Sequence, residues 1–299
     1  MKKISETVVF FGSGPVAAKA LELLSADFNI EVVITKPQPL HHKNKFEVIA
    51  VSVKNNLKIE YASNKLELSE LIKKRKFKSR LGVVIDYGII ISKDVIDYFQ
   101  LGIINSHFSL LPKWRGADPI SFAILNGDKL TGVSIILINE AMDEGQLLTQ
   151  KSINLDKNID SIQLTTKLIK LSQSLLISTI PNYINGKISP YNQKGRPSYS
   201  RKLTKEDGQI DFLKPADKLE REIRAYIEWP RSKIKINNTN IIVTKAHLKS
   251  GQGKAGNIFQ LNKELGIYTT KNILIFDKLI PQGKNEMSVE AFLAGYKTS

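Results

Sequence analysis

The sequence predicts an α/β protein in which a Rossmann-like, doubly wound domain precedes a smaller OB-like β-barrel domain. The chain has 299 residues, which is long for a single hydrophobic core. Its first half alternates short apolar runs with helical patterns, as doubly wound sheets do. Its last third contains closely spaced β-patterned runs, which are typical of small barrels. We expect the first domain over residues 1–187, a linker over 188–206 and the OB-like domain over 207–299.

The N-terminal elements follow from apolar periodicity. Strands are expected at residues 7–11, 30–35, 82–86, 102–105 and 133–138. Helices are expected at residues 16–24, 46–55, 66–73, 92–99 and 161–183. In such sheets, ligands bind beyond the carboxyl ends of the strands. Asn105 and the segment Asp86-Tyr87-Gly88 end two of these strands, so we expect both to face one crevice.

The C-terminal elements begin after a connector, residues 189–200, that is rich in Pro, Gly and Ser. A helix is expected at residues 215–226, and strands at 233–236, 241–246, 256–261, 266–270 and 273–279. A last helix, capped by Ser288, is expected to turn Val289, Phe292 and Leu293 inward. Five short strands at this spacing indicate a barrel of the OB type.

Composition excludes several classes of function. The chain has no cysteine, which excludes a disulfide framework, a thiolate metal site and a thiol nucleophile. The apolar start at residues 7–11 is too short for a signal peptide, and nowhere do about 18 apolar residues follow one another. We therefore expect a cytoplasmic protein with no membrane partner.

The charge favours a polyanionic partner. Net charge is +15 and the pI is about 9.7, a balance that attracts nucleic acid. Residues 201–299 carry 18 basic and 11 acidic residues, so charge density there is about double that of the first 200 residues. A general lysine-rich composition explains the excess equally well.

Three polar residues form a minimal set for acyl transfer. Asn105 supplies an amide that can donate to an oxyanion, His107 supplies a proton shuttle, and Asp143 supplies a carboxylate that orients the shuttle. Taken singly, such residues are more often a turn amide, a structural histidine and a loop carboxylate. Their combination points to catalysis.

Asn105, His107 and Asp143 belong to a longer series of short sequence motifs. It consists of Asn105 to Gly116, Asn126-Gly-Asp128, Thr131-Gly-Val133, Met142 to Gly145, Tyr199 to Leu203, Ile223-Arg-Ala225 and Trp229-Pro230. On these residues the chain resembles, nearly end to end, the formyltransferases that use 10-formyltetrahydrofolate, and most closely those acting on methionyl-tRNA. The resemblance implies formyl transfer to the α-amino group of methionyl initiator tRNA, with Asn105, His107 and Asp143 as catalytic residues. We expect a monomer that needs no metal.

The resemblance also implies binding residues. It places the folate carrier at Ser109, Leu110, Leu111 and Pro112, and at Asp86, Tyr87 and Gly88, although the first segment also fits a packing turn. Contacts to the substrate or tRNA are expected from Arg115, His41, His42, Lys43 and Lys45. The loop that holds the last four is shorter than in the family and has no arginine, and a solvated loop is nearly as plausible.

Other functions remain open. Gly12-Ser-Gly14-Pro-Val-Ala17 follows the first strand as a dinucleotide fingerprint does, but a proline after the second glycine fits the turn of the formyltransferases better. Within the family, an amino-sugar nucleotide is the alternative substrate. A non-catalytic RNA-binding protein on the same scaffold is the second alternative, against which the three retained polar residues argue.

Overall fold

A computed structural model describes residues 4–38, 46–237 and 239–296. The chain divides into two compact units. The N-terminal unit comprises Met1–Gly116, Thr131–Ile153 and Thr165–Tyr199. The C-terminal unit comprises Ala117–Leu130, Asn154–Leu164 and Ser200–Ser299.

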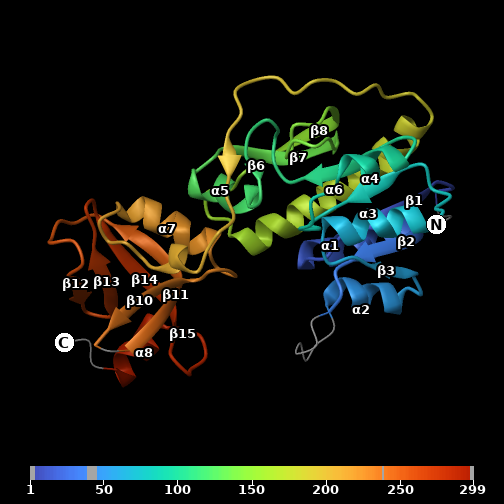
Figure 1. The fold of residues 1–299 in the computed structure, drawn as a ribbon. Helices are drawn as coiled ribbons and strands as arrows, with labels where there is room; N and C mark the ends of the chain where they lie inside the picture. The colour runs from blue at the N-terminus through green and yellow to red at the C-terminus, as the bar shows by residue number, and fades with distance from the viewer. Residues whose placement is uncertain (1–3, 39–45, 238, 297–299) are drawn as a thin grey trace. The chain divides into compact units, whose positions relative to one another are not determined.

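The N-terminal unit is built on a seven-stranded sheet in the order β3-β2-β1-β4-β5-β7-β8 (Figure 1). The strands are β1 (Thr7–Phe11), β2 (Asn29–Thr35), β3 (Ile59–Tyr61), β4 (Gly82–Val84), β5 (Ile103–His107), β7 (Leu130–Leu137) and β8 (Leu147–Asn154). From β3 to β5 the strands are parallel, whereas β7 pairs with β5 in the antiparallel sense. The predicted Rossmann-like α/β architecture is confirmed.

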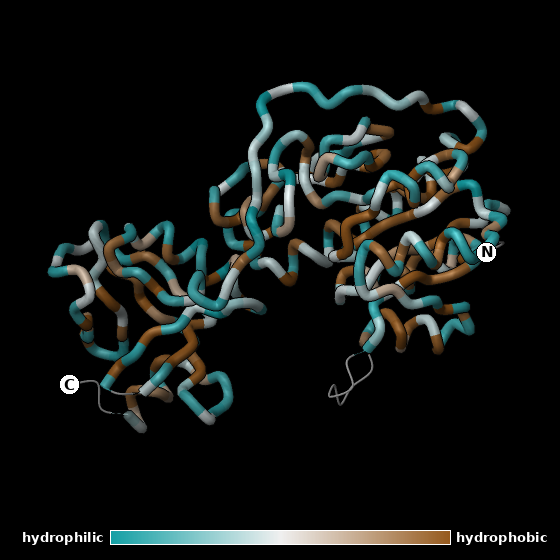
Figure 2. Tube along the Cα trace, in the orientation of Figure 1, coloured by the Kyte–Doolittle hydropathy of each residue, from teal (hydrophilic) through white to brown (hydrophobic). Residues whose placement is uncertain are grey.

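The helices of this unit are α1 (Pro15–Asp27), α2 (Glu47–Lys54), α3 (Lys65–Lys74), α4 (Lys93–Tyr98) and most of α6 (Ser161–Ile184). α3 begins with a side-chain cap, since the Asn64 side chain accepts from the amides of Leu66 and Glu67. Figure 2 shows apolar segments along the central strands, and all of residues 8–11 and 32–34 are fully buried. This buried core fixes the strand ends at which the polar residues lie.

Sequence periodicity missed β3 and β8, which are the two edges of the sheet. Edge strands pack on fewer neighbours and are often short or polar. β3 has three residues, and the outer half of β8 is polar. Two further strands, β6 (Arg115–Gly116) and β9 (Tyr199–Ser200), have only two residues each. Strands this short form because a partner strand lies beside them, and they are too short to show an alternating apolar pattern in the sequence.

The C-terminal unit is an antiparallel β domain. Its sheet runs β10-β11-β14-β13-β12, with β15 paired to β14. The strands are β10 (Ser232–Ile236), β11 (Thr239–Lys249), β12 (Ile258–Leu261), β13 (Glu264–Tyr268), β14 (Ile273–Pro281) and β15 (Met287–Ser288). The five predicted strands correspond to β10 to β14.

The described part of this unit also contains the first turn of α6, the helices α5 (Pro119–Leu125), α7 (Ala216–Ala225) and α8 (Val289–Gly295), and the 3₁₀ turn η1 (Glu206–Gly208). α7 joins the unit's separate segments, because Arg221 donates to the Leu125 carbonyl at 3.1 Å and Arg224 to the Ile159 carbonyl at 2.7 Å. Ser288 caps α8 as expected, and Val289 and Phe292 are buried. Within the described ranges, no helix is long and apolar enough to cross a membrane.

Candidate active site

Two turns meet at the carboxyl ends of β1 and β4, where the strand order of the sheet reverses. The amides of Ser13 and Gly14 both donate to the Asp86 carbonyl oxygen at 3.0 Å. A Cβ atom on Gly12 would lie 2.6 Å from the Ala17 Cβ and 2.9 Å from the Ile85 carbonyl oxygen, so this approach requires glycine. The glycine-rich turn is therefore explained by packing between two turns. This is also the position at which open α/β sheets bind ligands.

The three residues predicted to be catalytic converge beside these turns. Asn105 and His107 are two residues apart on β5 and so point to the same face. Asp143 lies in the turn between β7 and β8. Its Oδ1 is 3.4 Å from the Asn105 Nδ2 and 3.6 Å from the His107 Nδ1. One carboxylate oxygen thus faces both the amide and the imidazole.

The partner of His107 assigns its tautomer. Its Nε2 lies 2.9 Å from the Trp114 carbonyl oxygen, and a carbonyl can only accept, so Nε2 carries a hydrogen. Nδ1 is then the nitrogen that can gain or lose a proton, and it faces Asp143. With 6% of its side chain exposed, His107 is held in a largely dry position.

The two oxygens of Asp143 have different surroundings. Oδ2 accepts a hydrogen bond of 2.7 Å from the Gly116 amide, whereas the contacts of Oδ1 with described residues are the two longer ones to Asn105 and His107. Asp143 has φ of 57°, in the sparsely populated left-handed region. Its turn packs tightly on β7, because a Cβ on Gly145 would lie 1.7 Å from the Leu137 carbonyl oxygen. The backbone thus aims one carboxylate oxygen at the site.

Several backbone groups of the 109–112 turn are hydrogen-bonded within the chain. The Ser134 hydroxyl donates to the Ser109 carbonyl at 2.6 Å and accepts from the Leu111 amide at 3.0 Å. Gln150 donates to the Leu111 carbonyl at 2.9 Å, and the peptide before Pro112 is cis. Folate contact by the turn, including Leu110, stays a prediction. Nothing in the sequence pattern marked Ser134 or Gln150 as its supports.

The 86–88 turn combines a buried tyrosine with an exposed aspartate. The Tyr87 ring is 3% exposed and packs edge-on against Phe11 at 5.8 Å, and this burial raises the pKa of its hydroxyl. Asp86 is exposed with φ of 46°. Gly88 accepts from the Lys36 ammonium at 2.9 Å. The carbonyl oxygens of Asp86, Tyr87 and Gly88 all accept hydrogen bonds within the chain, and folate contact by this segment stays a prediction.

The residues predicted to contact the substrate or tRNA are placed only in part. The Arg115 side chain is 12% exposed, pairs with Glu144 at 2.7 Å and donates to Gln193 at 2.9 Å. These contacts give it a role inside the N-terminal unit, and contact with substrate stays a prediction. The others lie outside the described residues: His41, His42, Lys43 and Lys45.

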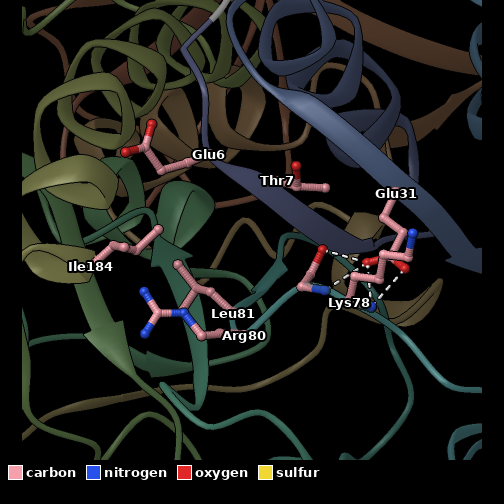
Figure 3. Close-up of a pocket in the computed structure, with 8 residues that line it drawn as sticks. Glu6, Thr7, Glu31, Lys78, Arg80, Leu81 and Ile184 are labelled. Atoms are coloured by element: carbon pink, nitrogen blue, oxygen red, sulfur yellow. Dashed lines mark hydrogen bonds between the residues drawn. The ribbon is translucent and has the colours of Figure 1, made fainter.

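An open cleft of about 480 Å³ lies elsewhere, at the amino ends of the strands (Figure 3). Thr7 at the start of β1 and Leu81 just before β4 line it. Glu31 in this cleft is bonded to the amides of Lys78 and Ser79 and to the Ser79 hydroxyl. Doubly wound sheets bind ligands at the other end of their strands, so we place the candidate active site around Asn105.

Solved structures with this fold include formyltransferases. An N-formyltransferase from Helicobacter canadensis, in complex with folinic acid and dTDP-3-aminofucose, has a TM-score of 0.68 and is 18% identical. The match covers 91% of this chain and 99% of that one. A sugar 3N-formyl transferase, in the presence of dTDP and 5-N-formyl-THF, has a TM-score of 0.68 at 20% identity, covering 95% and 100% of the two chains. These likenesses show the fold.

Comparison of sequences identifies the family of this chain. Residues 6–180 match the formyl transferase family, and residues 202–297 match the formyl transferase C-terminal domain. A methionyl-tRNA formyltransferase of Thermodesulfovibrio yellowstonii is 31% identical, over 98% of this chain and 97% of the relative. One from Francisella philomiragia is 33% identical, over 99% and 96%. With both domains matched and relatives aligned along almost all of their length, the chain belongs to the formyl transferase family.

Proposed function

We propose that the protein transfers the formyl group of 10-formyltetrahydrofolate to the α-amino group of methionyl-tRNA, giving formylmethionyl initiator tRNA. The observation that carries the proposal is the meeting of Asn105, His107 and Asp143 at a single carboxylate oxygen. Relatives that bear this activity in their names are 31% to 35% identical along nearly the whole chain.

In the reaction, the amine nitrogen attacks the formyl carbon and a new C–N bond forms. Negative charge then builds on the formyl oxygen, where the Asn105 amide donates a hydrogen bond. His107 Nδ1 accepts the proton that leaves the amine, and Asp143 stabilises the resulting imidazolium. The bond from the carbon to N10 of the folate breaks as N10 takes this proton from His107, which returns to its neutral form. A preorganised oxyanion donor contributes roughly 3 to 4 kcal/mol, and an acid or base about 10²-fold to 10⁴-fold.

The tRNA requires a second surface. We propose that residues 207–299 act as an OB-like, tRNA-binding domain and that the loop around Lys43 assists it. The basic balance of residues 201–299 supports this role, because phosphate contacts dominate nucleic-acid affinity. We further propose that the enzyme works in the cytoplasm as a monomer.

An amino-sugar nucleotide is the alternative substrate, and the solved sugar formyltransferases of the same fold favour it. Their identity of 18% to 20% is well below that of the tRNA-modifying relatives. Non-catalytic RNA binding is the second alternative. It predicts tRNA affinity without formyl transfer.

The decisive experiment incubates the purified protein with 10-formyltetrahydrofolate and charged initiator tRNA, and measures the product by mass. We expect a formyl group on the methionine, and none on an amino-sugar nucleotide run in parallel. If the amino-sugar nucleotide is formylated and the methionyl-tRNA is not, the protein is a sugar formyltransferase. If tRNA binding involves about five phosphate contacts, log affinity should fall with log salt at a slope of roughly 4; a flat response would argue against tRNA.

A further inference from the structure

The connector that follows α6 returns along the N-terminal unit as an extended segment (Figure 1, yellow). Tyr191 forms a backbone bridge with Leu147 at the start of β8. Between residues 191 and 197 every residue is exposed except Gln193. A polar side chain that turns inward from an otherwise exposed strand needs partners inside the protein.

The Gln193 amide has partners on both sides. Its Nε2 donates to the Asp143 carbonyl at 2.7 Å and to the Gly145 carbonyl at 2.9 Å. Its Oε1 accepts from the Arg115 guanidinium at 2.9 and 3.3 Å. The amide orientation follows, because two carbonyls can only accept and a guanidinium can only donate.

Arg115 links the Gln193 side chain to Glu144 and to the backbone around His107. Its second arm pairs with Glu144 at 2.7 Å. Its neighbours in the chain hold the catalytic pair by their backbones: the Trp114 carbonyl accepts from His107, and the Gly116 amide donates to Asp143. Gln193 and Arg115 therefore tie together the 114–116 and 143–145 segments.

We propose that Gln193 is a positioning residue for formyl transfer, which holds the Asp143 turn so that the carboxylate meets Asn105 and His107 at one point. The inference rests on the proposed function of that site. Asp143 sits at φ 57°, a conformation that persists only when surrounding contacts hold it. Two hydrogen bonds to the turn supply such contacts, and a misplacement of about 1 Å can cost 10²-fold in rate.

The test is Gln193→Glu, which keeps the shape and the acceptor for Arg115 but replaces the two amide hydrogens by an oxygen facing two carbonyls. We expect kcat for tRNA formylation to fall about tenfold or more, with both KM values within about twofold. Gln193→Leu removes the amide without adding charge and should lower kcat similarly. Gln146→Glu is the matched control, because the Gln146 side chain is exposed and, among the described residues, donates to Asn192 at 3.0 Å and makes no contact with the Asp143 turn that is comparable to those of Gln193; its kcat should not change.

A double variant separates positioning from general damage. In an Asp143→Asn background, Gln193→Glu should cause no further loss of kcat, because its effect acts through Asp143. An equal loss in both backgrounds, or an unchanged kcat for Gln193→Glu and Gln193→Leu alone, would overturn the inference. Thermal unfolding of each variant checks that the fold is retained.

A second measurement does not depend on enzymatic activity, so it tests the role of Gln193 even if the proposed function is wrong. Amide hydrogen exchange at residues 141–146 should quicken in Gln193→Glu but not in Gln146→Glu. If Asp143→Asn formylates tRNA at the wild-type rate, the catalytic assignment fails, whatever Gln193 does. If exchange at this turn stays unchanged in Gln193→Glu, the positioning role fails, whatever the substrate.

Discussion

Two carboxylates of the N-terminal unit, those of Glu31 and Asp143, differ in how many short hydrogen bonds they accept. Glu31, near the start of β2, accepts from the Lys78 amide at 2.8 Å, the Ser79 amide at 2.7 Å and the Ser79 hydroxyl at 2.6 Å. Within the part of the chain that the structure describes, Asp143 has a short hydrogen bond on Oδ2, while the contacts of its Oδ1 are 3.4 and 3.6 Å long. Glu31 lies in the open cleft, yet its hydrogen-bonding capacity is largely filled.

This difference favours Asp143 over Glu31 as the carboxylate for the proposed reaction. Burial by itself raises the Glu31 pKa, but the Ser79 hydroxyl and the backbone amides together bring that pKa below its ordinary value. A carboxylate held in this way joins β2 to the segment before β4. Asp143 instead keeps an oxygen available beside a base and an amide. The surroundings of each carboxylate are therefore more informative here than the volume of a cleft.

The largest expected effect comes from Asp143→Asn, which keeps the shape and removes the charge. We expect kcat for formyl transfer to fall about 10²-fold to 10³-fold, or about 3 to 4 kcal/mol, because the imidazolium loses its partner. Steady-state kinetics with initiator methionyl-tRNA measure this. A rate near that of the wild type would show that Asp143, like Glu31, has no chemical role.

The same change at the other end, Glu31→Gln, should affect stability alone. We expect a loss of about 1 kcal/mol in the free energy of unfolding, because the hydrogen bonds to a charged acceptor become bonds to a neutral one. Formylation should proceed at the wild-type rate. Urea unfolding and kinetics on the same preparation test both parts, and a large fall in kcat would assign a functional role to the cleft.

Acid should abolish that stability difference. Because the pKa of Glu31 is lower in the folded than in the unfolded protein, its contribution is fully present above the unfolded value of about 4.3 and is lost as pH falls through the folded value. The difference between wild type and Glu31→Gln should be constant from about pH 7 to 5 and shrink below about pH 4. A difference that grew in acid would reverse the assigned sign.

Ser79→Ala should have the smallest effect. It removes one of the donors to Glu31 and leaves two backbone amides in place, so we expect a loss of about 0.5 kcal/mol in unfolding free energy. The midpoint of urea unfolding measures it. A loss larger than that of Glu31→Gln would show that the hydroxyl has another role.

Much of the fold could be predicted because buried periodic segments carry a strong signal. The strand at residues 7–11 has the predicted bounds, and Asn105 does lie near a strand end. β5 extends two residues beyond its predicted end, to His107, because its last residues pair with β7. β3, β8 and α5 went unpredicted, since short edge strands and a two-turn helix depend on what they pack against.

The amino-acid sequence by itself determined the family series, the apolar strands and the presence of an amide, an imidazole and a carboxylate. Only the tertiary structure decided that Asn105 and His107 face one oxygen of Asp143, and that Gln193, about fifty residues further along the chain, holds that turn. The physical reason is that these contacts run largely through backbone carbonyls and amides. Those groups are the same in every residue, so their partners are selected by the fold and leave no pattern in the sequence.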